Sequence, residues 1–142
     1  MTEPCGVGID VAKATLDVAW STNPTARWQT TNDETGWAAL VAHLRTLQPT
    51  VIVLEATGGD EIGAASALSA AGLPVATVNP RQVRDFAKAL RLWEKTDAID
   101  AGVLAAFAVR MQPAPRPLPD DLHADLQALV TRRRQLVDML TA

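Results

Sequence analysis

Apolar and polar positions alternate in two short runs near the start of the chain. In GVGIDV every second residue from Val7 is β-branched, and TLDVAW shows the same period of two from Leu16. This alternation is typical of strands with one buried face, and the small residues around Ala12 and Lys13 predict a hairpin turn between them. The run ARWQTTN supplies a third candidate strand.

The rest of the chain alternates helical patterns with continuous apolar runs. After a cap at Asn32 or Asp33, apolar residues recur at spacings of three and four until Pro49, which predicts a helix. TVIVLEA and LPVATVNP are runs typical of strands buried on both faces of a parallel sheet. Further helices are predicted for DEIGAASALSAAG, PRQVRDFAKAL and DAIDAGVLAAFAVRM. One face of the last is assigned to Ile99, Val103, Ala106 and Val109 or Arg110.

The resulting order, β-β-β-α-β-α-β-α-α, predicts an α/β fold with a mixed five-stranded sheet covered by helices. Prolines at positions 113, 115, 117 and 119 then predict an extended connector over residues 112–119. Leucines spaced 4-3-7-4 follow, a pattern typical of a short helical coiled coil of about three heptads. We therefore expect a domain over 1–111, the connector, and the start of a coiled-coil helix over 120–142.

Composition fits one soluble globular domain, with 142 residues of which 48% are hydrophobic and 20% charged. No apolar run is long enough to cross a bilayer, and the first residues lack a secretory pattern. A lone Cys5 cannot form an internal disulfide. We expect a cytoplasmic protein with no membrane partner.

Charge is distributed unevenly along the chain. Residues 1–80 hold three basic and eight acidic residues, whereas residues 81–142 hold ten basic and eight acidic ones. A basic stripe recurs at spacings of three and four on one predicted helix, at Arg81, Arg84, Lys88 and Arg91. Such a stripe is suited to DNA or RNA phosphates, although a solvated helix face has the same pattern. Lys13 and Lys95 are further candidate phosphate contacts, with solvated lysines as the alternative.

Four carboxylates stand at positions where an ionised side chain is unfavourable unless a partner compensates its charge. The stretch KTDAIDA puts Asp97 and Asp100 three residues apart, on one face of a helix, where like charges repel. Asp10 and Glu55 end apolar strands that are expected to be parallel neighbours, ~4.8 Å apart. Such oxygen ligands suit Mg²⁺ or Mn²⁺, and two ions ~3.5–4 Å apart could support phosphoryl transfer. Each acid alone has an ordinary alternative role as a turn or cap residue.

The segments GIDVAKATLDVA, VIVLEATGG, GLPVATVNPRQVRDFAKAL and KTDAIDA together resemble a known family over residues 5–111. They are similar to the amino-terminal domain of DEDD transposases of the IS-one-ten (IS110) insertion-sequence group, which are related to the Piv-type DNA invertases. The resemblance implies an RNase H-like fold of the RuvC type, with the acidic tetrad at Asp10, Glu55, Asp97 and Asp100. It also implies Mg²⁺ dependence, transposition by DNA recombination, and a structured guide RNA.

Members of that family carry a second domain with a serine nucleophile, reached through a coiled coil that supports a dimer or tetramer. We expect this chain to be a fragment that lacks the second domain, with Ser21, Ser66 and Ser69 in structural roles. The sequence departs from the family pattern at Asp60, Ala98 and around Arg91 to Glu94.

Two other functions compete with a nuclease-like transposase domain. One is a nucleic-acid-binding and dimerisation module that is inactive as an isolated fragment. The other is an actin-like or sugar-kinase ATPase, but VAKATLD follows the first aspartate where those proteins need a glycine- and threonine-rich phosphate loop. Within VIVLEATGG, residues 57–59 could let a nucleic-acid backbone approach, or could simply turn the chain from strand to helix.

Overall fold

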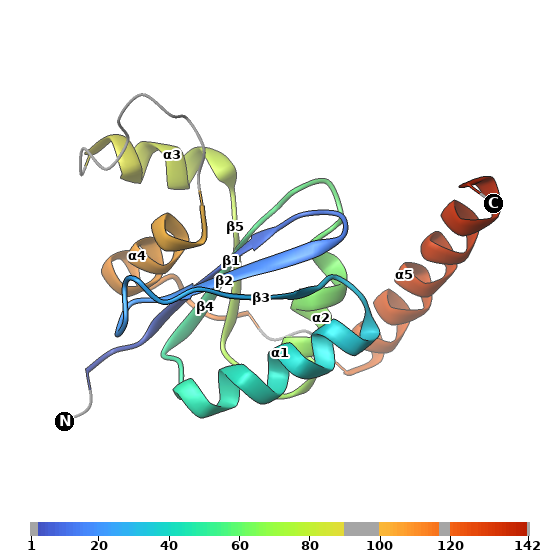
Figure 1. The fold of residues 1–142 in the computed structure, drawn as a ribbon, viewed down its shortest axis with the longest axis horizontal. Coiled ribbons are helices and arrows are strands. Elements are labelled where there is room, and N and C mark those ends of the chain that lie inside the picture. The colour runs from blue at the N-terminus through green and yellow to red at the C-terminus, as the bar shows by residue number, and fades with distance from the viewer. Residues whose placement is uncertain (1–2, 90–99, 117–119, 142) are drawn as a thin grey trace.

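A five-stranded mixed sheet forms the centre of the molecule (Figure 1), with strand order β3-β2-β1-β4-β5. This computed structural model describes residues 3–89, 100–116 and 120–141, with the backbone alone for 120–127. β1 pairs antiparallel with β2 and parallel with β4, as the sequence predicts. The strands are β1 (Gly6–Val11), β2 (Thr15–Trp20), β3 (Trp28–Thr31), β4 (Val51–Glu55) and β5 (Val75–Val78).

Helices cover both faces of this sheet. α1 and α2 lie on one side and α3 and α4 on the other, while α5 packs against α2 (Figure 1). The element order is the predicted one, with the helices at α1 (Glu34–Leu47), α2 (Ile62–Ala70), α3 (Pro80–Ala89), α4 (Ala101–Met111) and α5 (Asp120–Thr141). No helix within the described ranges is long and apolar enough to cross a membrane.

Alternation along β1 divides its residues between two cores. Val7 and Ile9 are fully buried against the α1 and α2 layer. Gly6 and Gly8 face α4, and a methyl group on Gly6 would lie only 2.7 Å from the backbone nitrogen of Val109. Because neither glycine has a side chain, α4 lies directly against the strand backbone.

This close packing corrects the face predicted for α4. Val103, Ala106 and Val109 are only partly buried and Arg110 is exposed, while Ile99 lies outside the described residues. The buried residues are instead Ala101, Leu104, Ala105, Phe107 and Ala108. Small alanines are selected because they are the residues that fit over two glycines.

The chain after α4 passes the β5 edge, where the Arg116 backbone N–H donates to the Val75 carbonyl at 2.9 Å. It then enters α5, whose helical state agrees with the leucine pattern. Leu129, Leu136 and Leu140 are exposed on this helix, whereas Val130 packs against the main core. Coiled-coil pairing through these leucines stays a prediction.

Candidate metal and nucleic-acid site

The carboxyl ends of β1 and β4 bring Asp10 and Glu55 to one edge of the sheet. The parallel register pairs Gly8 with Val53 and Ile9 with Leu54. Continued by one residue, this register places Asp10 beside Glu55, on strands ~4.8 Å apart. Since side chains alternate, both carboxylates share the face on which Gly8 contacts α4.

A third acid joins this row from β2, and the sequence reasoning missed it. The antiparallel register aligns Asp17 directly with Asp10. Its Oδ1 accepts a hydrogen bond of 2.7 Å from Nε2 of Gln29, the residue opposite it on β3. The usable signal was the hairpin itself: a turn at residues 12–14 pairs position 10 with position 17 and puts them on one face.

Asp100 approaches the same edge from above the sheet. It is the N-cap of α4, and its Oδ1 accepts a hydrogen bond of 3.0 Å from the Val103 backbone N–H. The expectation that it lies within a helix is wrong, because its backbone is extended, with φ −106° and ψ 179°. Asp97, its predicted partner, lies outside the described residues.

The pKa values of Asp10 and Glu55 reflect their burial and the neighbouring charges. Burial raises the pKa of Asp10 above its ordinary value, and the carboxylates of Asp17 and Asp100 raise it further. Burial also raises the pKa of Glu55; the Arg84 guanidinium partly offsets this and Asp10 adds to it. Ionisation of Asp10 and Glu55 is therefore less favourable here than in water, and a bound cation would offset this cost.

These described carboxylates are neighbours, although they do not form a closed cage. Among the residues with assigned positions, no three acidic, histidine or cysteine groups already converge tightly enough to hold a metal ion. The chemistry of the donors nevertheless fits a hard divalent cation, since Asp10, Glu55 and Asp100 offer only carboxylate oxygens. Two of the three have raised pKa values that a bound cation would lower.

Basic residues flank this acidic edge. Arg81, Arg84 and Lys88 all have exposed positions on α3, and Arg84 is near enough to Glu55 to influence its pKa. Lys13 is exposed in the β1–β2 turn. The predicted contacts Arg91 and Lys95 lie outside the described residues.

The glycine-rich turn after β4 uses two of its backbone N–H groups within the fold. The N–H groups of Thr57 and Gly59 donate to Oε2 of Glu61, at 3.1 and 3.0 Å. Gly58 and Gly59 have φ values of 77° and 114°, which explains why glycine stands there. These two N–H groups are therefore used within the strand-to-helix turn, and approach of a nucleic-acid backbone to residues 57–59 stays a prediction.

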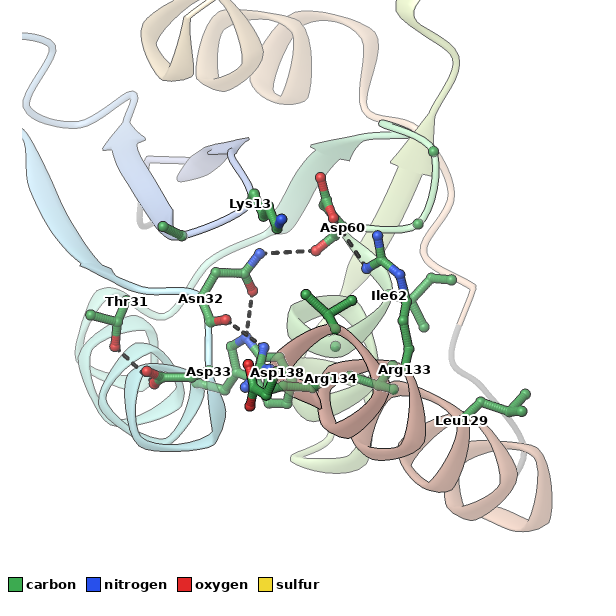
Figure 2. A pocket seen from close by; sticks show the side chains of 17 residues that line it. Lys13, Thr31, Asn32, Asp33, Asp60, Ile62, Leu129, Arg133, Arg134 and Asp138 are labelled. Atoms are coloured by element: carbon green, nitrogen blue, oxygen red, sulfur yellow. Dashed lines mark hydrogen bonds and ion pairs between the residues drawn. The ribbon is translucent and has the colours of Figure 1, made fainter. Parts of the chain in front are cut away.

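Next to this turn, a cavity of about 590 Å³ lies between α5 and the loops at the sheet edge (Figure 2). Lys13, Asn32 and Asp60 line one wall, with Asn32 joined to Asp60 by a hydrogen bond, and Arg133 and Arg134 reach in from α5. Arg133 forms an ion pair of 3.3 Å with Asp60. The Arg134 guanidinium lies 5.2 Å from the centre of the Trp37 ring.

The chain is similar in sequence to a known protein family and to two characterised relatives. A family model described as a transposase, of the DEDD IS110 type, matches residues 7–142. The chain belongs to this transposase family. It is also 32% and 31% identical to the pilin gene-inverting proteins of Moraxella lacunata and Moraxella bovis, over 92% of its own length in each case. It spans 44% of the length of these two relatives.

The transposase chain is also similar in fold to a solved structure. It matches RuvC from T. thermophilus, determined in complex with a Holliday junction substrate, with a TM-score of 0.56 and 18% identity. The match covers 82% of this chain and all of that one. An α/β fold of the RNase H-like, RuvC type is therefore confirmed.

Proposed function

We propose that this chain is the amino-terminal catalytic part of a metal-dependent DNA transposase or recombinase. Asp10, Glu55, Asp97 and Asp100 would hold Mg²⁺, with Mn²⁺ as a substitute. The observation that carries the proposal is that Asp10 lies beside Glu55 on paired strands and is close enough to Asp100 for its pKa to be affected, in a chain of this family. The DNA inversion named for the Moraxella relatives is the same class of reaction.

Each described residue has a definite task in this proposal. A bound divalent cation would supply charge neutralisation for phosphoryl transfer at a DNA end. Asp10 and Glu55 would provide oxygens from the ends of paired strands, and Asp100 would provide an oxygen from the start of a packed helix. Arg84 and its neighbours on α3 would hold the phosphate backbone beside them, with Lys13, Arg91 and Lys95 as further contacts.

Strand exchange would need parts beyond those described. We propose that a serine nucleophile from a second domain and a structured guide RNA complete the active assembly. Its dimer or tetramer would form through the coiled-coil segment, and the exposed Leu129, Leu136 and Leu140 on α5 support that pairing.

A second function is favoured by the same exposed faces. The basic face of α3 and the apolar face of α5 suit a nucleic-acid-binding and dimerisation module that is inactive as an isolated fragment. The two proposals differ in whether divalent metal binds through the acidic edge.

The deciding experiment is a calorimetric titration of the chain with Mn²⁺, repeated with Asp10→Asn, Asp97→Asn and Asp100→Asn. Each substitution removes one negative oxygen donor with almost no change in shape. Glu34→Gln, an exposed acid in the first turn of α1, is the matched control. Saturable binding that is lost in the three variants and kept in the control supports the catalytic proposal, whereas equal binding in all of them rejects it.

A further inference from the structure

Asn32 is a buried polar residue, 6% exposed, whose side chain joins three parts of the fold. Its amide nitrogen donates to the carbonyl oxygens of Ala12 and Asp60, at 2.9 and 3.1 Å. Its side-chain oxygen accepts a hydrogen bond of 2.8 Å from Nε1 of Trp37. The backbone N–H of Asn32 donates to Ala14 at 2.9 Å, so the β1–β2 turn is held at two points.

The helix α5 contacts this same residue. Nη2 of Arg134 donates to the backbone carbonyl of Asn32 at 2.6 Å. The neighbouring Arg133 pairs with the carboxylate of Asp60, whose carbonyl oxygen Asn32 already binds (Figure 2). Two successive arginines of α5 therefore contact Asn32 itself and Asp60, one of the two residues to which the Asn32 amide donates.

The segments joined by Asn32 are the ones that leave the acidic edge. Ala12 follows Asp10 by two residues, and Asp60 follows Glu55 by five. The second segment contains Gly58 and Gly59, which restrict the backbone least. The β1–β4 ladder pairs the two strands as far as Ile9 and Leu54. A link between Asp60 and the β1–β2 turn adds a second restraint, on the loops that directly follow Asp10 and Glu55.

We propose that Asn32 is a positioning residue of the metal site: it clamps the loops after β1 and β4, and Arg134 makes this clamp depend on the docking of α5. The inference rests on the proposed function, because it assumes that Asp10 and Glu55 bind one metal centre. Asn32 acts through the backbone of Ala12 and Asp60 rather than through the metal-binding carboxylates themselves.

Asn32→Ala is the direct test, because it removes both amide donors and leaves the backbone contact with Arg134 in place. Asn23→Ala, the same change at an exposed position, is its control. We expect Mn²⁺ affinity to fall by roughly 10- to 100-fold, the range seen when partners that orient metal ligands are removed. Amide hydrogen exchange should also accelerate at residues 12–14 and 57–61, with no change in the Asn23 variant.

Arg134→Met tests the α5 contribution without touching the buried amide, and Arg132→Met, at an exposed position of the same helix, is its control. A severalfold loss of Mn²⁺ affinity and faster exchange in both loops are expected for Arg134→Met alone. Parental affinity and exchange in both the Asn32 and Arg134 variants would overturn the inference. Absence of Mn²⁺ binding by the parent protein would instead reject the proposed function, and the exchange rates would still report on the clamp.

Discussion

Replacing Gly8 by alanine tests whether α4 is seated against β1 as described. The added methyl group would lie 2.6 Å from Cβ of Leu104, and closer still to backbone atoms of Ala101 and Ala105. Ordinary contacts of a Cβ atom begin at 3.4 Å. The start of α4 must therefore retreat by roughly 1 Å, because most of the opposing atoms are backbone and cannot rotate away.

The cost follows from this displacement. Overpacking of a tight interior costs about 1–3 kcal/mol, against which alanine recovers about 0.5–1 kcal/mol of the conformational entropy that glycine loses in a strand. Because the nearest opposing atoms are backbone, the upper part of the overpacking range applies, about 2–3 kcal/mol. The net loss of about 1–2.5 kcal/mol corresponds to a fall in melting temperature of roughly 3–10 °C for a chain of this size. Because Asp100 directly precedes Ala101, the displacement should also move it from Asp10 and weaken Mn²⁺ binding at least tenfold.

The assay combines thermal unfolding with Mn²⁺ titration, and Gly72→Ala is the matched control. Gly72 has φ 79°, and a methyl group added there would meet no described atom within 4 Å, so its substitution costs about 1–2 kcal/mol through the backbone alone. It should lower the melting temperature by a similar amount and leave Mn²⁺ affinity unchanged. Parental stability and affinity in Gly8→Ala would refute the described seating of α4.

Three further outcomes follow from the charges and caps. Asp10→Asn should stabilise the metal-free protein at neutral pH, because it removes a carboxylate whose ionisation is opposed by burial and by Asp17 and Asp100, and denaturant unfolding measures this gain. The folded-state pKa values of Asp10 and Glu55 lie above the ordinary 3.8 and 4.5, so the stability of the metal-free protein should fall as pH rises through the folded pKa values. Mn²⁺ should reverse this loss. Melting curves recorded across pH, with and without Mn²⁺, check both outcomes. Asp33→Ala should lower the free energy of unfolding by about 0.5–2 kcal/mol, because it removes the N-cap hydrogen bond from the Gly36 N–H. That bond lowers the pKa of Asp33, so the difference in stability between parent and variant should disappear as pH falls through the folded pKa. Urea titrations at two pH values measure this difference.

The sequence was sufficient to predict the elements that place Asp10 and Glu55. Continuous β-branched runs indicate parallel strands, and acids at their ends must meet at one edge. The buried face of α4 was not predictable from periodicity, which favours the face that carries Val103, Ala106 and Val109. The buried face is set by Gly8, which is distant in sequence: its missing side chain lets the alanine-rich face with Ala101 and Ala105 pack against β1.

Asn32 and Asp17 show a second limit of sequence reasoning. Asn32 and Asp33 were equal candidates for the helix cap, and the structure assigns the cap to Asp33 and the loop contacts to Asn32. Nothing in the sequence distinguishes Asp17, because one acid in a half-buried strand is ordinary. Its importance depends on which residue lies opposite, a property of register rather than of composition.

The bond between Asp100 and Val103 has a practical consequence. The same carboxylate begins α4 and contributes to the charge around Asp10, so the Val103 amide proton sits one hydrogen bond away from the acidic row. Its NMR chemical shift should therefore act as an intrinsic reporter of Mg²⁺ loading, readable without DNA and without turnover.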